Sequence, residues 1–372
     1  MSPRINNRSR GLSLVELMVA LAVSGLLLLG LVQVFIGNKQ NYVLQESLSH
    51  VQENGRYALF HLGQELQTAG YLGCSASLDN VLDAGHASYS AALFDFSAAV
   101  SGWEYLGSGI ADVVNLAVLP APAANHWDDD GGNDLTPSLL VDAVAGSDVL
   151  VVKRAEEALP LALATPMVAG NSGVDLVGAV PAVAQAQTDE FYVLGNCSRA
   201  VLFQNCDAGA EDLDLSGCLS GAGRIGPGNA AATWPEAYSV DGTLHPVRAT
   251  AFYVRRNPAG VPALYRKRFH DASGDPAEEL VEGVENMQVL YGVDTDSDSV
   301  PNAYVTADQV NGNPVVAVEV ALMLRALVPA DAQNTVEQHQ LTLTDVQTPA
   351  DRWFRKSMAA TVKLRNRGRF DG

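Results

Sequence analysis

The chain begins with a short basic segment, and a long apolar stretch follows. Arg4, Arg8 and Arg10 precede residue 12, and Glu16 is the only charged residue between positions 12 and 37. About 20 consecutive apolar residues are enough to cross a bilayer as a helix. We therefore predict a helix over residues 12–37 that lies in lipid or in a similarly apolar environment.

The apolar residues of the next segment, residues 38–70, recur every three or four positions. The recurring positions are Leu44, Leu48, Val51, Gly55, Ala58, Leu62, Leu66 and Ala69. This spacing is typical of an amphipathic helix with one buried face. No proline, the strongest helix breaker, occurs between Pro3 and Pro120, so one continuous helix is predicted. A coiled coil is the alternative, but the apolar stripe stops at Gly70, and Gly70 and Gly73 predict the helix end.

Residues 71–372 have the pattern of a β-rich domain with long loops. The turn signal Asn257-Pro258-Ala259-Gly260 separates two strand-like runs, residues 248–256 and 261–269, and predicts a hairpin. Residues 314–327 form the most apolar predicted strand, and a last strand is expected within residues 352–367. The fold class is therefore α+β, with a long N-terminal helix packed on an antiparallel sheet that carries long insertions.

Glu16 distinguishes between the interpretations of the apolar segment. A secretory signal peptide would have an apolar region of about 7 to 15 residues, followed by an A-x-A-like cleavage site. No such site follows residue 37 in a convincing form. A plain membrane anchor leaves Glu16 unexplained, because a carboxylate inside a membrane helix costs roughly 2.5 to 3.5 kcal/mol. We therefore expect Glu16 to have a specific function.

The segment Gly11-Leu12-Ser13-Leu14-Val15-Glu16, followed by the apolar helix, resembles the class III signal of type IV pilins and pseudopilins. The resemblance implies that prepilin peptidase removes the leader, residues 1–11, by cleaving after Gly11. Leu12, which replaces the commoner phenylalanine, would become the N-methylated N-terminus. Glu16 would then pair with the methylated amine of Leu12 on a neighbouring subunit and set the register of assembly.

Further segments resemble the PilW family of minor pilins: Glu53–Leu59, Ala69–Cys74, Val281–Met287, Tyr291–Asp294 and Leu364–Arg367. The resemblance implies a type IV pilin-like fold and a minor pilin that helps initiate type IV pilus assembly near the filament tip, in a pilus used for twitching motility. Its implied partners are other minor pilins, the major pilin, a tip adhesin, prepilin peptidase and the inner membrane.

The resemblance also implies a domain order and a location. Residues 12–37 would span the inner membrane or lie in the filament core, with the N-terminus in the cytoplasm. Residues 38–70 would be the amphipathic half of the helix, and residues 71–372 a periplasmic globular domain that becomes extracellular in the pilus. The basic leader and the net charge of −19 agree with this orientation.

Two other functions remain open at this stage. A minor pseudopilin of type II secretion would share the signal and the fold. An exported adhesin or a DNA receptor would use the globular domain for binding. The acidic net charge disfavours nucleic acid, although five basic residues fall on the predicted hairpin: Arg255, Arg256, Arg266, Lys267 and Arg268. No catalytic motif is found, so we do not expect an enzyme.

Four cysteines follow the apolar segment, at Cys74, Cys197, Cys206 and Cys218. Export to an oxidising compartment favours disulfides over a zinc site, and the sequence contains no C-x-x-C motif. Four cysteines allow three pairings. We favour Cys74–Cys197, which would tie the helix end to the sheet, and Cys206–Cys218, which would close a small loop.

Alternating carboxylates from Asp294 onward form a candidate calcium loop. The candidate ligands are Asp294, Asp296, Asp298 and Asn302. A D-x-D-x-D spacing is used by loops that wrap oxygen ligands around calcium. Ser299 replaces the usual turn glycine, and Val305 stands where an EF-hand has its glutamate. A solvated acidic turn is therefore the alternative to a calcium site.

Overall fold

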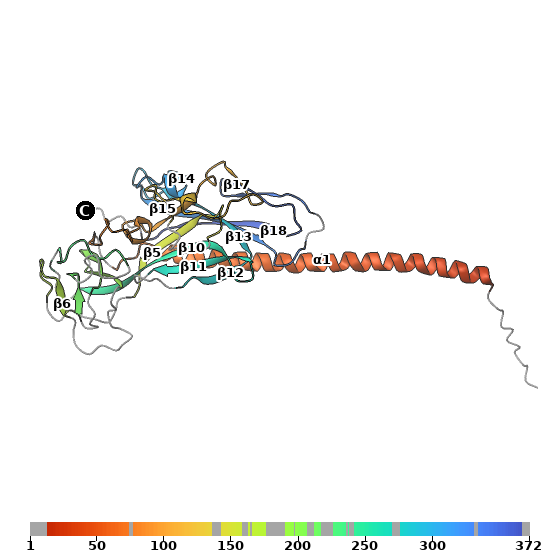
Figure 1. Ribbon diagram of the computed structural model, residues 1–372, viewed down its shortest axis with the longest axis horizontal. Coiled ribbons are helices and arrows are strands. Elements are labelled where there is room, and N and C mark those ends of the chain that lie inside the picture. The colour runs from red at the N-terminus through yellow and green to blue at the C-terminus, as the bar shows by residue number, and fades with distance from the viewer. Residues whose placement is uncertain are drawn as a thin grey trace, which may run out of the picture.

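The computed structural model describes residues 13–73, 77–135, 143–157, 163, 166–175, 190–196, 198–206, 212–216, 226–235, 237, 242–269, 276–330 and 334–366. A single long helix, α1 (Leu14–Thr68), runs along the β domain and projects far beyond it (Figure 1). Its 55 residues correspond to a length of about 80 Å. The predicted continuous helix is confirmed, and its apolar half extends away from the rest of the protein.

The amphipathic half of α1 packs on the β domain, as the spacing predicted. Its buried residues are Ser47, Val51, Gly55, Ala58, Leu62 and Leu66. Leu44, which the pattern also assigned to this face, is 37% exposed, so the contact begins about one turn later. At Gly55 an added Cβ would lie 2.4 Å from the Sδ atom of Met358. The missing side chain therefore allows the helix to approach the sheet closely.

The larger sheet has nine strands. Its main path joins β1 (Leu78–Asn80), β8 (Ala200–Gln204), β7 (Phe191–Gly195), β10 (Thr243–Arg256), β5 (Val149–Ala155), β2 (Val100–Tyr105) and β4 (Trp127–Asp128). Two further strands continue from β10: β11 (Pro262–Phe269) and β12 (Glu278–Glu282). The predicted hairpin is confirmed, because β10 and β11 pair across the turn at residues 257–260. The strand β12 pairs antiparallel with β11 and forms the edge of this part of the sheet.

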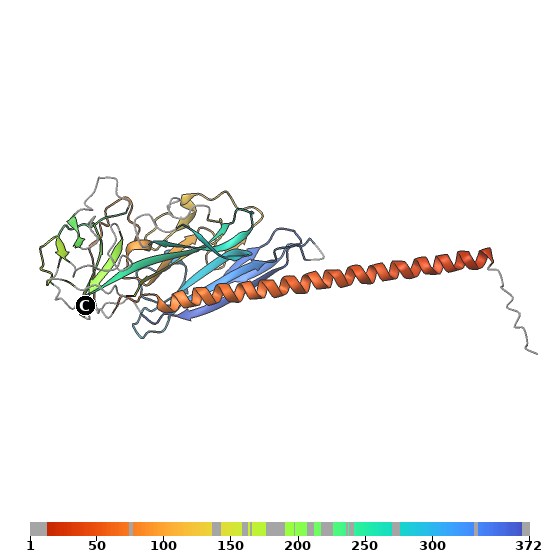
Figure 2. The same cartoon turned by 90° about the horizontal axis from the view of Figure 1, so that it is seen from below.

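The second sheet contains the C-terminal part of the chain. Its order is β14 (Ala303–Val305), β13 (Val284–Val293), β15 (Val315–Arg325) and β18 (Arg355–Lys363), all antiparallel. Figure 2 shows these blue strands alongside α1. One face of β13 and β15 packs on Val51, Leu62 and Leu66 of the helix, within one apolar cluster. This sheet therefore holds α1 in place.

Smaller elements complete the described part of the domain. Three strands, β16 (Gln338–Leu341), β17 (Thr344–Gln347) and β3 (Val113–Asn115), cover the other face of β15. The remaining elements are β6 (Gly173–Asp175), β9 (Asp212–Asp214), the helix α2 (Ala91–Phe94) and the 3-10 turns η1 (Ala124–His126) and η4 (Ala307–Gln309). Two strand pairs, β1 with β8 and β17 with β3, are parallel, so the domain is mainly but not entirely antiparallel.

Candidate assembly and ligand sites

The start of α1 is organised by Glu16. Ser13 is the N-cap, and its Oγ accepts a hydrogen bond of 3.2 Å from the backbone N–H of Glu16. The Glu16 carboxylate in turn accepts one of 3.0 Å from the backbone N–H of Ser13. This reciprocal pair is a capping box, which satisfies two donors that a helix end otherwise leaves unpaired. The pattern Ser-x-x-Glu could have identified Ser13 from the sequence, but only Glu16 was singled out.

The processing residues Gly11 and Leu12 lie outside the described residues, as does the whole leader, so cleavage and methylation stay predictions. Among the described residues, α1 alone is long and apolar enough to cross a membrane, judged by length and composition. None of its most apolar window is buried against the domain. The structure therefore leaves the segment that follows Ser13 uncovered and available to lipid or to other helices.

Cys206 is the one cysteine within the described residues, and it is disulfide-bonded. Cys74, Cys197 and Cys218 lie outside those residues. The pairing of Cys206 with Cys218, and of Cys74 with Cys197, therefore stays a prediction. Cys206 is buried at the end of β8, where Asn229 Nδ2 lies 3.2 Å from its Sγ.

Three of the four candidate calcium ligands are brought together after β13. The carboxylates of Asp294, Asp296 and Asp298 contribute oxygens that lie within 4.8 Å of one another. Asn302 is directed elsewhere, since its Oδ1 accepts hydrogen bonds from the backbone N–H and the Oγ1 of Thr295 at 2.7 and 3.0 Å. The predicted set of four is therefore only partly assembled.

Asp294 shapes this acidic loop through its own hydrogen bonds. Its two carboxylate oxygens accept from the backbone N–H groups of Ser297 at 2.7 Å and of Ser299 at 2.8 Å. Both serines have positive φ angles, 67° and 74°. The carboxylate thus holds a turn that serine adopts only at some cost. The arrangement offers oxygen ligands to a hard cation such as calcium. The Asp294 carboxylate also has hydrogen-bond donors within the turn and does not require a cation, so calcium binding stays a prediction.

The basic side chains of the β10–β11 hairpin lie close to acidic and aromatic groups. Arg266 Nε and Arg268 Nη2 lie 2.8 and 3.7 Å from the carboxylate of Glu278 on the neighbouring strand β12. The Arg255 guanidinium lies over the Tyr265 ring, 5.3 Å from its centroid. These contacts partly neutralise the cluster, which weakens the case for a phosphate-binding surface at this hairpin.

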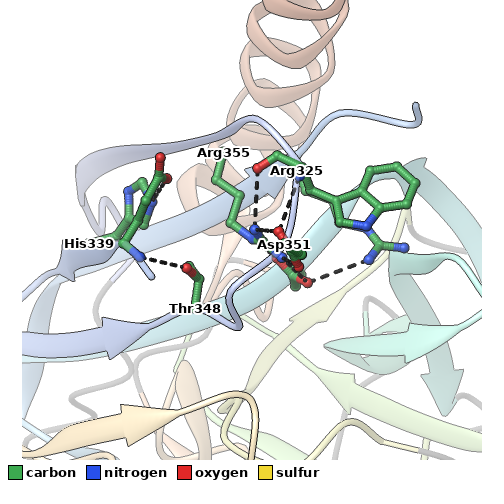
Figure 3. Close-up of polar contacts among 8 residues, drawn as sticks. Arg325, His339, Thr348, Asp351 and Arg355 are labelled. Atoms are coloured by element: carbon green, nitrogen blue, oxygen red, sulfur yellow. Dashed lines mark hydrogen bonds and ion pairs between the residues drawn. The ribbon is translucent and has the colours of Figure 1, made fainter. Parts of the chain in front are cut away.

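An ion-pair network, not foreseen from the sequence, fixes the beginning of β18. The buried guanidinium of Arg355 donates to Asp351 Oδ1 and Oδ2 at 2.6 and 2.8 Å, and to Glu285 Oε2 at 2.6 Å (Figure 3). Arg325 lies over the Trp353 ring at 4.5 Å from its centroid. Burial raises the pKa of Asp351, but the hydrogen bonds from Arg355 outweigh it and hold that pKa below its ordinary value. The network joins β13, β15 and β18.

A cavity of about 710 Å³ lies beside β2, with Lys153 in its wall. Lys153 is 1% exposed, and among the described residues its Nζ has no hydrogen-bond partner. Burial lowers the pKa of Lys153 to about 8, although Asp95 and Asp129 partly oppose this. Those two carboxylates accept hydrogen bonds within their own loops, for example Asp129 from the Gly131 N–H at 2.8 Å. Burial of an ammonium group without a hydrogen-bond partner disfavours the folded state, so Lys153 contributes a stability cost.

Two buried carboxyl groups lie where β2, β5 and β13 meet. Asp148 accepts hydrogen bonds from the backbone N–H groups of Tyr105 at 3.2 Å and Val289 at 2.9 Å. The Ser108 hydroxyl lies 3.1 Å from Glu104 and 3.2 Å from Asp148. Burial, and then the charge of Asp148, raise the pKa of Glu104 to about 10. Glu104 is therefore protonated at neutral pH, and the pair avoids two adjacent buried charges.

Comparison with known proteins gives two matches, one at the start of α1 and one in the C-terminal part of the chain. A model of the prokaryotic N-terminal methylation motif matches residues 6–32, at the start of α1. A model of the type IV pilus-assembly protein W matches residues 251–366, from within β10 to beyond β18. Curated proteins and solved structures gave no match. The two family matches, on the helix and on the sheet that holds it, support a PilW-like minor pilin of the type IV pilus.

Proposed function

We propose that this PilW-like chain is a minor pilin that helps to initiate pilus assembly and lies near the filament tip. One observation carries the proposal: a single helix joins the methylation motif to the sheet matched by the pilus-assembly family. Its first 24 residues, 14–37, are exposed along most of their length, whereas its second half is packed on the sheet. Such a helix can leave the membrane and enter a bundle of similar helices without refolding the domain.

In this proposal Glu16 changes partners during assembly. In the uncleaved chain it caps the helix through the Ser13 N–H. After cleavage behind Gly11, the new amine at Leu12 would lie next to Ser13, and the carboxylate would pair with the amine of an adjacent subunit. A charge pair inside an apolar bundle contributes more to register than to net stability. Glu16 would thus select the axial position of the subunit.

The proposed location and partners follow from the same chemistry. The N-terminus would be cytoplasmic, the domain periplasmic, and the assembled protein part of the extracellular pilus. Prepilin peptidase, other minor pilins, the major pilin and a tip adhesin would be its partners. We propose a structural rather than an enzymatic role, because the described polar clusters form turns and ion pairs within the fold.

Mass spectrometry of the protein from piliated cells tests the processing step. The expected chain begins at N-methylated Leu12, and a chain that begins at Met1 would refute the proposal. Glu16→Ala tests the assembly step, with Glu16→Gln as the matched control that keeps a capping acceptor but removes the charge. Both variants should remain in the membrane and be depleted from filaments. Normal piliation in both variants would count against the role of Glu16.

A further inference from the structure

The strand β18 is the open edge of the sheet that holds α1. It pairs with β15 without a register shift, from Ala317 opposite Lys363 to Arg325 opposite Arg355. Among the strands of the described chain, β15 is its only pairing partner, so its other side presents unpaired backbone groups. Such an edge is a template for an additional strand unless charges, proline or a bulge protect it.

The centre of β18 has none of these protective features. Residues 358–362, Met-Ala-Ala-Thr-Val, contain no charge and no proline. The basic residues lie towards the two ends instead, at Lys356, Lys363 and Arg365. Ala359 and Thr361 are exposed in the middle of the strand. An uncharged centre bracketed by positive charges favours a guest strand that is uncharged in its middle and acidic at its flanks.

A groove beside β18 provides space for such a strand. It has a volume of about 490 Å³ and is lined by Gln67 of α1 and by residues 361–365. On the helix, Phe60, Gly63 and Gln67 are three and four residues apart and therefore lie on one side. A Cβ at Gly63 would be 4.0 Å from Val362, which places this side of the helix next to β18. Phe60, one turn away, is 59% exposed and offers an apolar wall.

We propose that this β18 groove, formed by residues 356–365 and the Phe60–Gln67 side of α1, binds an extended acidic strand of another pilus subunit. The guest would hydrogen-bond to the free edge of β18, and its alternate side chains would contact Phe60 and the groove beside Gln67. Strand addition takes its affinity from main-chain hydrogen bonds and its specificity from such side-chain contacts. The inference rests on the proposed function, which makes another pilus subunit the partner.

The charges argue against a second copy of β18 as the guest. Antiparallel pairing of two β18 strands would bring the basic ends of both copies, with Lys356, Lys363 and Arg365, close together. Like charges that lie close together on neighbouring strands repel each other. An acidic strand would instead be attracted by Lys356, Lys363 and Arg365, three basic groups on a chain of net charge −19. The charges of the groove therefore disfavour a second copy of β18 and favour an acidic strand of different sequence.

Site-specific photo-crosslinking of the full chain in pilus-forming cells tests the proposal. A benzophenone amino acid replaces Thr361 at the exposed centre of the edge, and the same probe at Val118, which is 74% exposed on the loop after β3, is the control. The expected product joins position 361 to an acid-flanked extended segment of another subunit. Combining the probe with Lys356→Glu, Lys363→Glu and Arg365→Glu should lower its yield roughly tenfold, which corresponds to about 1.4 kcal/mol, because exposed charge pairs are individually weak.

The outcomes separate the groove from the proposed function. Three outcomes would refute the binding of an acidic strand at the β18 groove: a product with a second copy of this chain, a product with a helix, or a yield equal to that from Val118. If this happens while the processed chain is present in filaments, the proposed function stands. A chain that remains unprocessed would refute the proposed minor-pilin function. Strand binding at the β18 groove would then still be tested by the same crosslink in membranes. Phe60→Ser, on an exposed position, should lower the yield without loss of folding and guards against misfolding of the charge variant.

Discussion

Replacing Lys153 with methionine should stabilise the protein below about pH 8. The lysine lies on β5 with its Nζ buried and, among the described groups, unpaired. Methionine has a similar length, carries no charge and adapts to irregular apolar surroundings. The substitution therefore removes a buried ammonium group while it keeps most of the packing against the neighbouring strands.

The magnitude follows from the pKa of Lys153, which burial lowers from 10.5 to about 8. Each pKa unit corresponds to about 1.4 kcal/mol, so the charged form costs on the order of 3 kcal/mol in the folded state. The folded state binds fewer protons than the unfolded state between pH 8 and 10.5. Wild-type stability should therefore rise with pH through this window because of Lys153, and the gain from Lys153→Met should shrink over the same range.

Urea unfolding of the full chain in detergent, followed from pH 6 to pH 10, measures this difference. The free energy of unfolding of Lys153→Met should exceed that of the wild type by about 2 to 3 kcal/mol at pH 7 and approach it near pH 10. Subtracting the two curves cancels the other titrating groups. Lys363→Met, at an exposed position of β18, is the control and should show no pH-dependent difference.

A parallel pH dependence of the two proteins would refute the reasoning. It would mean that Lys153 is equally solvated, or equally paired, in the folded and unfolded states. A loss of stability in Lys153→Met at pH 7 would also refute it, because it would show that the ammonium group is stabilised by a partner. Both results can be distinguished from misfolding by the cooperativity of the unfolding transition.

Three further predictions concern other parts of the fold. Gly55→Ala should destabilise the protein by about 1 kcal/mol or more, because the new Cβ would meet Met358, whereas Gly63→Ala should stabilise it by about 0.5 to 1 kcal/mol; equal effects in thermal unfolding would contradict the close approach at Gly55. Between pH 5 and 8 the free energy of unfolding of the wild type should fall relative to that of Glu104→Gln by up to about 1.4 kcal/mol per pH unit, because the raised pKa keeps Glu104 protonated only in the folded state. A difference between the two proteins in urea unfolding that does not change with pH would argue against this. If the acidic loop binds calcium, calorimetric titration of the full chain should give a dissociation constant of about 0.1 to 1 mM, and the double variant Asp296→Asn, Asp298→Asn should lose this binding. No heat at millimolar calcium in the wild type would show that the loop is a turn without bound calcium.

The sequence by itself predicted the elements that depend on local patterns. The apolar stretch from residue 12 and the stripe that includes Val51, Ala58 and Leu62 predicted one continuous helix, which forms α1. The turn at residues 257–260 predicted the β10–β11 hairpin, and its register is observed. These predictions succeed because helix periodicity and turn chemistry act over a few neighbouring residues.

The tertiary structure decided everything that depends on which strands become neighbours. β2 lies next to β5, although a long stretch of chain separates the two strands. Lys153, near the end of a strand-like run, is buried because β2 and β10 flank β5 and both of its faces are covered. Local sequence carries no signal for such burial, because the neighbours come from segments far apart along the chain.

The polar sites show the same division. Ser13 and Glu16 are three residues apart, so their capping box is a property of the sequence. Arg355 and Glu285 are 70 residues apart, and only the pairing of β13, β15 and β18 brings them together. The open side of β18 is likewise a consequence of strand order, which the hydrophobic pattern of a strand does not specify, because that pattern sets the faces of a strand and leaves its edges undetermined.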